Sequence, residues 1–227
     1  MKVAAVIPAA GTGRRMKSET SKQFLRLGSK PILFYTLAKF ERVSEVDQVI
    51  LVVREEDMML AAQEVDRYGI RKVNKIVAGG AERQDSVYAG LRALEGRPDF
   101  VVVHDAVRPF ASEELIRLSI QHALEFGAVV AAVPVTSTIK RVAAGEVVET
   151  VNREELWEVQ TPQVFRYELI LTAYEEAERE GFRATDDAAL VERIGATVRV
   201  LVGERSNIKI TTPEDLALAE FLLGRMR

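Results

Sequence analysis

The chain has 227 residues, of which 48% are hydrophobic and 29% charged, a balance typical of a globular protein and not of a disordered or fibrous one. This length favours one large α/β domain, residues 1–227, over two domains. The chain has no cysteine, which excludes a disulfide scaffold, a cysteine nucleophile and a thiolate metal site. No apolar run approaches the ~20 residues of a membrane helix and no signal peptide is recognisable, so we expect a cytoplasmic protein without membrane contact.

The net charge of −3 is unevenly distributed. The segment Gly11–Lys30 contains six basic residues and one acidic residue, a net charge of +5, which leaves −8 for the rest of the chain. A short cationic segment in an acidic protein fits a compact anion better than a nucleic acid, because nucleic-acid binders spread basic residues over a whole face. We therefore expect a small anionic ligand and no nucleic-acid partner.

Strand and helix patterns alternate from the first residues to about residue 133. Valine and isoleucine runs indicate buried strands, and apolar residues at helical spacing indicate helices. The predicted strands are 2–8, 48–53, 72–77, 100–104 and 128–133, and the predicted helices are 31–42, 55–68, 84–94 and 112–126. This alternation predicts a Rossmann-like, mostly parallel mixed sheet with helices on both faces.

The alternation stops after Pro134. Residues 136–151 have threonine, isoleucine and valine on both sides of a turn with Gly145, which indicates a β-hairpin. We expect this hairpin to protrude as an arm, at about residues 136–155, and to pair with another subunit. The remaining predicted elements are helices at 167–180 and 187–194, a strand at 197–202, and a last helix that starts at Pro213 and is capped by Thr212.

A glycine-rich loop follows the first predicted strand. Residues 9–16 read Ala-Ala-Gly-Thr-Gly-Arg-Arg-Met, and their small side chains let backbone N–H groups approach a phosphate at the carboxyl end of a strand. Basic residues from Arg14 to Lys22 supply charge for an anion as strong as a nucleoside triphosphate. The loop is neither a dinucleotide-binding fingerprint, which needs glycine at position 16, nor a P-loop.

With Lys22 and Gln23, this loop resembles the signature of nucleotidyltransferases that join a nucleoside monophosphate to a phosphorylated sugar or polyol. More closely, the chain is similar to the 2-C-methyl-D-erythritol 4-phosphate cytidylyltransferases of the non-mevalonate isoprenoid pathway. Further blocks typical of that family are GGAERQDSV at 79–87, VHDAVRP at 103–109, TIKR at 138–141, NR at 152–153, TPQ at 161–163, TDD at 185–187 and NIKITTPED at 207–215. They cover nearly the whole chain, and the set is specific although each block alone is weak.

The resemblance implies transfer of CMP from CTP to 2-C-methyl-D-erythritol 4-phosphate with Mg²⁺ as cofactor and pyrophosphate as the second product. A phosphate monoester has a second pKa of ~6, so its oxygen is ionised near neutrality and would attack the α-phosphorus in line without a general base. The protein then has to align two anions and stabilise the charge of the transition state, which cations and backbone donors do.

The resemblance also implies a role for each matching residue. The catalytic residues would be Arg15, Lys22, Arg153 and Lys209. The CTP-binding residues would be Ala10, Gly11, Gly13, Gly80, Ala81, Arg83 and Ser86. The residues binding the polyol phosphate would be Asp105, Arg108, Thr138, Arg153, Thr161 and Lys209. Asp105 would either accept hydrogen bonds from the substrate's hydroxyls or help to hold Mg²⁺, an ion expected to be held mostly by triphosphate oxygens.

In the family, the residue that matches Arg153 reaches the active site of the partner subunit, which implies a homodimer with sites shared through the arm. His104 and Trp157 are expected to pack and not to take part in catalysis. Two positions depart from the family pattern. Ser21 stands where proline is common before Lys22, and Ser206 stands where aspartate is common before Asn207.

Three other functions stay open. The nearest is a cytidylyltransferase for ribitol 5-phosphate, or another sugar or polyol phosphate nucleotidyltransferase, which would share the loop and the arm. A non-catalytic nucleotide- or RNA-binding module would use the +5 segment, but the acidic remainder and the lack of interleaved aromatic residues disfavour it. A nicotinamide-dependent dehydrogenase would need glycine in place of Met16.

Overall fold

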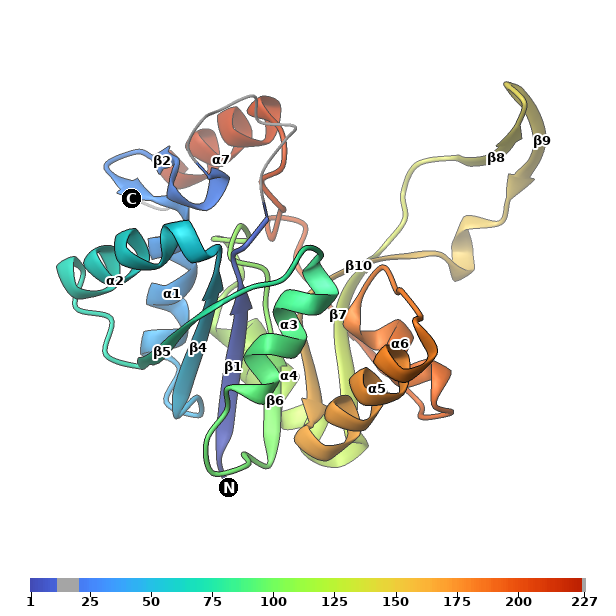
Figure 1. Ribbon diagram of the computed structural model, residues 1–227. Helices are drawn as coiled ribbons and strands as arrows, with labels where there is room; N and C mark the ends of the chain where they lie inside the picture. Colours follow the sequence, from blue (N-terminus) through green and yellow to red (C-terminus); the bar gives the residue numbers. More distant parts are fainter. Residues whose placement is uncertain (12–20, 226–227) are drawn as a thin grey trace.

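The centre of the structure is a seven-stranded sheet (Figure 1) with the strand order β11-β7-β10-β6-β1-β4-β5. The computed structural model describes residues 1–11 and 21–225. The strands are β1 (Val3–Pro8), β4 (Gln48–Val53), β5 (Val73–Ala78), β6 (Phe100–Val103), β7 (Ala128–Pro134), β10 (Trp157–Arg166) and β11 (Arg199–Val202). β10 is antiparallel to both of its neighbours, and the other adjacent pairs are parallel. The predicted fold class, a mostly parallel mixed sheet, is confirmed.

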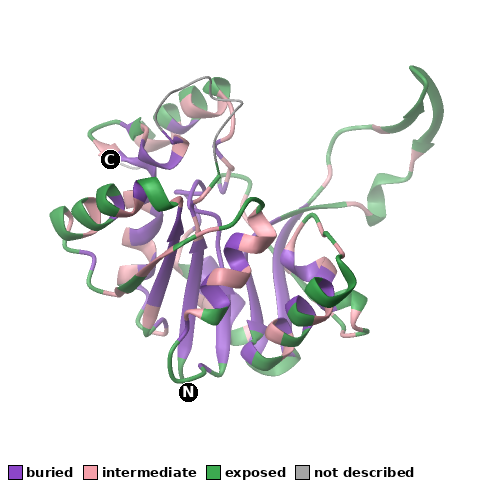
Figure 2. Ribbon diagram, in the orientation of Figure 1, coloured by how far each residue is buried: buried purple, intermediate pink, exposed green. Residues whose placement is uncertain are grey.

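Helices cover both faces of this sheet. They are α1 (Ile32–Arg42), α2 (Met58–Arg67), α3 (Arg83–Arg92), α4 (Glu113–Phe126), α5 (Tyr167–Glu180), α6 (Asp187–Arg193) and α7 (Pro213–Arg225). On β1, Val3, Ala5 and Ile7 pack into a core with α1, α2 and α4, while Ala4 and Val6 pack with α3, α5 and α6. Successive strand side chains point to opposite faces, so an apolar strand needs a helix layer on each side. Figure 2 shows the result, a buried sheet between helices exposed on their outer faces.

A third, smaller core lies beyond the carboxyl ends of the parallel strands (Figure 1). It joins α7 to β2 (Arg26–Leu27) and the start of α1 through buried residues such as Leu27, Ile32 and Ala219. β2 follows η2 (Lys22–Phe24) and pairs with β3 (Lys30–Pro31). The predicted cap of the last helix is present, because the Asp215 amide donates to Thr212 Oγ1 at 3.3 Å. This core brings the segments that carry Lys22 and Lys209 to the same edge of the sheet.

β10 is the main element that the sequence pattern does not reveal. It contains Pro162 and three glutamines or glutamates, whereas a central strand is usually apolar and free of proline. In the structure, the pairing register of β10 with β7 shifts between Val159 and Gln163, and this irregularity accommodates the proline. A second difference is that the predicted helix 55–68 is divided into η3 (Glu55–Asp57) and α2.

The predicted arm is present as a hairpin of β8 (Ile139–Ala143) and β9 (Glu146–Val151), followed by η4 (Arg153–Glu155). Ala144 and Gly145, with φ of 51° and 85°, form the tight turn, a conformation that suits hairpins. The hairpin extends away from the sheet and its helices (Figure 1), and Val142, Val147 and Val148 are more than half exposed. Within residues 1–11 and 21–225, no helix combines the length and the apolar character that crossing a membrane requires.

Candidate active site

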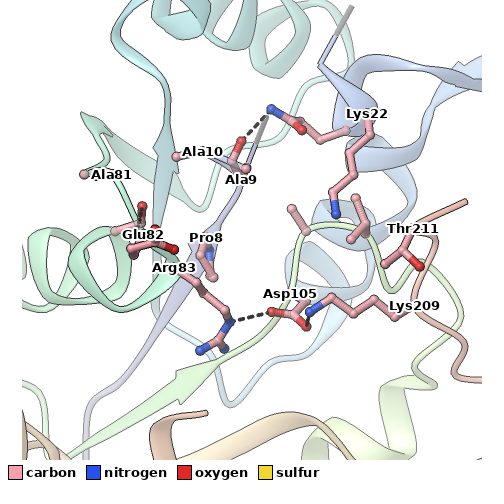
Figure 3. A pocket seen from close by; sticks show the side chains of 16 residues that line it. Pro8, Ala9, Ala10, Lys22, Ala81, Glu82, Arg83, Asp105, Lys209 and Thr211 are labelled. Atoms are coloured by element: carbon pink, nitrogen blue, oxygen red, sulfur yellow. Dashed lines mark hydrogen bonds and ion pairs between the residues drawn. The ribbon is translucent and has the colours of Figure 1, made fainter. Parts of the chain in front are cut away.

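A pocket of about 400 Å³ opens at the carboxyl ends of β1 and β6 (Figure 3). Parallel strands end at the same edge of a sheet, where loops from distant parts of the chain meet. The pocket is lined by Pro8, Ala9, Ala10, Gly11, Lys22, Gln23, Gly80, Ala81, Glu82, Arg83, Ser86, Asp105, Ala106, Val107, Lys209 and Thr211. It therefore combines the end of β1, η2, the start of α3, the turn after β6 and the segment before α7.

Most of the predicted site residues meet in this pocket. Those that line it are Ala10, Gly11, Lys22, Gly80, Ala81, Arg83, Ser86, Asp105 and Lys209. Arg108 and Thr161 lie directly behind Asp105, which they contact. Thr138 and Arg153 are exposed on or beside the arm and do not line the pocket of their own chain. Gly13 and Arg15 lie outside the described residues.

Asp105 lies between three cationic side chains. Its Oδ1 accepts a hydrogen bond from Arg83 Nε at 3.0 Å, its Oδ2 lies 2.7 Å from Lys209 Nζ, and Arg108 Nε is 3.7 Å from Oδ2. Burial by itself raises the pKa of this carboxyl, but the charges of Arg83, Lys209 and Arg108 outweigh it and hold the pKa well below its usual range. Asp105 is thus a permanent anion that gathers cations at the pocket wall.

Arg83 joins Asp105 to a second buried carboxylate, Asp187, at the start of α6. Its Nη1 and Nη2 donate to the two oxygens of Asp187 at 3.0 and 2.7 Å, and the Tyr174 hydroxyl donates to the same carboxylate. Burial disfavours the guanidinium charge, but the two carboxylates outweigh this effect and raise the pKa of Arg83. Asp187 is not among the residues predicted for the site. The block at 185–187 contains it, but its pairing with Arg83 depends on a contact across 104 residues.

The glycines after β5 bring backbone into the pocket. A Cβ on Gly79 would lie 2.6 Å from the Ala10 Cβ, and one on Gly80 would lie 2.3 Å from the Asp85 Cβ, so no larger residue fits either position without a shift. Glu82 and Asp85 form a capping box at the N-terminus of α3. The positive end of this helix thereby lies at the pocket, an arrangement that favours anions.

His104 supports the turn that carries Asp105 and Arg108. Its ring is fully buried, 5.2 Å from the ring of Phe40, and its Nε2 lies 3.2 Å from the Arg108 carbonyl oxygen. Burial lowers the pKa of His104 to about 4, so the ring is neutral near pH 7. The prediction that His104 packs is confirmed.

Trp157 is less well packed than predicted, with 38% of its surface exposed, because it lies where β10 leaves the sheet toward the arm.

Asn207 ties the segment before Lys209 to the rest of the site. Its Nδ2 donates to the Thr161 carbonyl at 2.8 Å, and its own carbonyl accepts from Arg108 Nη1 at 2.7 Å. Ser206, which departs from the family pattern, is exposed beside it. Asn207 therefore holds this segment together with the Lys209–Asp105 pair and the bond from the Ile210 amide to the Val107 carbonyl.

Carboxylates suited to a metal are scarce at this site. In the part of the chain that the structure describes, no three or more histidine, cysteine, aspartate or glutamate side chains are grouped to hold a metal ion. Both oxygens of Asp105 already face cations. The pocket instead offers Lys22, Arg83, Lys209 and the N-terminus of α3, which are donors suited to phosphate groups. A doubly covered α/β sheet with such a pocket at its carboxyl edge is the architecture typical of nucleotide-binding enzymes.

Comparison with known proteins identifies the family. The family described as "IspD: 2-C-methyl-D-erythritol 4-phosphate cytidylyltransferase" matches residues 3–225, and the chain belongs to this family of nucleotidyltransferases. A relative of that name from Alkaliphilus metalliredigens is 50% identical over 100% of this chain and 95% of its own length. Another from Halalkalibacterium halodurans is 48% identical over 99% of this chain and 98% of its own length.

Solved structures agree with this assignment. The 4-diphosphocytidyl-2C-methyl-D-erythritol synthase of Anaerococcus prevotii has a TM-score of 0.87 and 37% identity, over 99% of this chain and 96% of that one. The 2-C-methyl-D-erythritol 4-phosphate cytidylyltransferase of Thermus thermophilus has a TM-score of 0.83 and 35% identity, over 99% of this chain and 100% of that one. The resemblance carried by the sequence motifs is thus confirmed at the level of the family and the fold.

The depressed pKa of His104 predicts a pH dependence of stability. Between about pH 6.5 and 4 the unfolded chain binds a proton at this ring that the folded chain does not, so the free energy of unfolding falls as the pH falls. We expect His104 to account for a loss of about 2 kcal/mol between about pH 7.5 and about pH 5. His104→Gln keeps an N–H donor for the Arg108 carbonyl but cannot titrate. Its free energy of unfolding, measured in urea, should therefore fall by about 2 kcal/mol less than that of wild type between the two pH values. The wild-type pH dependence in His104→Gln would contradict the assignment.

Proposed function

We propose that the protein transfers CMP from CTP to 2-C-methyl-D-erythritol 4-phosphate, giving 4-diphosphocytidyl-2-C-methyl-D-erythritol and pyrophosphate. The observation that carries the proposal is the convergence of Lys22, Arg83 and Lys209, from three separate segments, with the α3 N-terminus on one pocket. The names of the similar proteins from Alkaliphilus metalliredigens and Halalkalibacterium halodurans support the choice of substrate. Family membership supports the choice of CTP.

The chemistry needs cations more than it needs a base. A phosphate oxygen of the polyol phosphate attacks the α-phosphorus of CTP in line; a new P–O bond forms while the bond to the β-phosphate breaks and pyrophosphate leaves. The attacking phosphate is already ionised near neutrality, since its second pKa is ~6. The protein must bring two anions together and stabilise the charge that develops on the α-phosphate and the leaving group.

We assign the roles as follows. Lys22 and Arg15 stabilise the transition state. Ala10, Gly11, Gly13, Gly80, Ala81, Arg83 and Ser86 bind CTP, largely through backbone groups. Asp105, Arg108, Thr138, Thr161, Arg153 and Lys209 bind the polyol phosphate, with Arg153 and Lys209 at its phosphate. Both oxygens of Asp105 already pair with cations, and a metal ion would have to displace one of them. We therefore assign hydrogen bonding to substrate hydroxyls as its main role.

We propose Mg²⁺ as the cofactor. The ion prefers oxygen ligands and keeps several waters, so a site made mostly of triphosphate oxygens suits it and agrees with the scarcity of grouped carboxylates among the described residues. When bound, it neutralises charge on the triphosphate. Of the two carboxylates that line the pocket, Glu82 caps the N-terminus of α3, and Asp105 could contact the ion at the cost of a contact to Arg83 or Lys209.

We also propose that the protein is one domain that forms a homodimer through the arm. The exposed valines of the hairpin are apolar surface that a partner would cover. Arg153 at the base of the arm donates to the Thr136 carbonyl at 2.5 Å and lies outside the pocket of its own chain, which supports its contribution to the partner's site.

Pyrophosphate release tests the proposed function. With CTP, Mg²⁺ and 2-C-methyl-D-erythritol 4-phosphate we expect turnover, and with UTP, GTP or ATP far less. The pocket wall around Asp105 should select the polyol, so ribitol 5-phosphate should be a poor substrate. A far higher kcat/KM for ribitol 5-phosphate would replace the proposed substrate by the nearest alternative. RNA binding with steep salt dependence and no turnover with any triphosphate would reject an enzyme altogether.

Lys22→Ala should lower kcat by about two to three orders of magnitude and change the KM for CTP much less. The reason is that a cation aimed at charge developing on the α-phosphate acts mainly in the transition state. Steady-state kinetics of pyrophosphate release measure both constants. A large rise in KM with a normal kcat would instead assign Lys22 to ground-state binding.

Arg153→Ala should raise the KM for the polyol phosphate. If the arm completes the partner's site, mixing Arg153→Ala with Lys22→Ala should restore activity, since a hybrid dimer holds one site with both wild-type residues. The measurement is the rate of pyrophosphate release after subunit exchange, compared with each variant alone. Each variant carried alone through the same exchange procedure is the control. No recovery in the mixture would count against a shared site.

A further inference from the structure

Ser21, directly before Lys22, is held by two charged residues from another part of the chain. The Ser21 hydroxyl donates to Asp57 Oδ2 at 2.8 Å and accepts a short hydrogen bond from Arg54 Nη2. Arg54 Nε in turn donates to Asp57 Oδ2 at 2.9 Å. Each of the three residues therefore contacts the other two.

These contacts are shielded from water and anchored to the central sheet. Ser21 is 4% and Asp57 8% exposed, so solvent competes little for their hydrogen bond. Arg54 directly follows β4, and Asp57 is the last residue of η3. The three residues thus connect the start of η2 to the carboxyl end of β4, next to the strand β1 that leads into the pocket.

Lys22 is held from its other side as well. Gln23, which is 1% exposed, donates from Nε2 to the Ala9 carbonyl at 2.5 Å, at the end of β1. Figure 3 shows the Lys22 side chain extending into the pocket. Lys22 is therefore held by a side-chain tether immediately before it, from Ser21, and by another immediately after it, from Gln23.

The backbone of Ser21 has φ of −55°, an angle that a proline ring would also impose on this position, and ψ of 131°, which lies in the extended region that proline adopts readily. Serine has no such covalent constraint. Where a relative has proline at this position, the ring restricts φ, whereas in this chain hydrogen bonds to the serine hydroxyl have that effect. The Arg54–Asp57 pair supplies those bonds. The contacts among Ser21, Arg54 and Asp57 therefore restrict the backbone conformation of the residue directly before Lys22.

We infer that Arg54 and Asp57 are positioning residues for Lys22 and act on it through the Ser21 hydroxyl. The inference rests on the proposed function, because it takes Lys22 as the residue that stabilises the transition state. A misplacement of about 1 Å can lower a rate by up to about 100-fold, so loss of the tether should affect kcat.

Replacement of Ser21 by alanine and by proline separates this task from a merely structural one. Ser21→Ala should lower kcat by about tenfold with the KM for CTP changed less than about twofold. Ser21→Pro should keep kcat within about twofold of wild type, because the ring restores the restricted φ without a hydroxyl. Ser44→Ala, an exposed serine whose hydroxyl bonds to Glu45, is the matched control and should leave both constants unchanged. A normal kcat in Ser21→Ala, or an equal loss in Ser21→Pro, would overturn the inference.

Asp57→Asn tests the other end of the tether. It should lower kcat about as much as Ser21→Ala does, and the double variant should be no slower than either, because both changes break the same connection. In a Lys22→Ala background, measured in single turnover, Ser21→Ala should cause no further loss. Losses that multiply in either combination would mean that Ser21 acts independently of Asp57 or of Lys22.

Hydrogen exchange distinguishes failure of this inference from failure of the proposed function. Amides of Lys22–Leu25 should exchange faster in Ser21→Ala and Asp57→Asn than in wild type or Ser21→Pro, whether or not the protein turns over CTP. Faster exchange in the two variants, together with a wild-type protein that releases no pyrophosphate, would leave the tether standing and reject the function. If the wild-type protein is active but exchange is unchanged in Ser21→Ala and Asp57→Asn, the tether alone is rejected.

Discussion

The site depends on one electrostatic constraint, namely that several cations lie close together at the wall of one pocket. Arg83, Arg108 and Lys209 would repel one another if they were gathered at the pocket wall without an anion between them. Asp105 lies among all three, and Asp187 balances the far side of Arg83. Buried charges of this kind are stable only when paired, so removal of either carboxylate leaves an uncompensated cation. The ion pairs therefore fix both the position and the charge of the side chains at the pocket wall.

The sheet makes this constraint possible by bringing distant segments to one edge. β1 and β6 are parallel neighbours, so the glycine loop and the turn with Asp105 begin side by side. α3 approaches β1 so closely at Gly90 that a Cβ there would lie 2.4 Å from Val6 Cγ1, and this contact fixes where the N-terminus of the helix lies. Small residues along β1 and α3 thus have a functional consequence, because they set the distance between the glycine loop and the helix end.

Parts of the site differ in how they are held. Asp105, Arg83 and Asp187 are fixed by buried ion pairs, whereas Lys22 lies on a short 3-10 turn whose neighbours are tied by the side chains of Ser21 and Gln23. Arg153 is on the exposed arm and is fixed in its own chain by a bond to a backbone carbonyl. This gradation agrees with the proposed roles, since the groups that shape the pocket are built into the core and those that act on phosphates reach it from the periphery.

Much of this protein follows from local sequence. Valine-rich strands alternating with helices determine a doubly covered parallel sheet, glycines at 79 and 80 allow close backbone approach, and motif blocks identify the family and most pocket residues. Only the tertiary structure shows that β10, a segment that contains Pro162, is an antiparallel strand inside the sheet. It also shows that Asp187 is the partner of Arg83 and Asp57 the partner of Ser21. The physical reason is the range of the interactions: the pairs Arg83–Asp187 and Ser21–Asp57 join residues 104 and 36 positions apart, and such pairing depends on how the sheet brings them together.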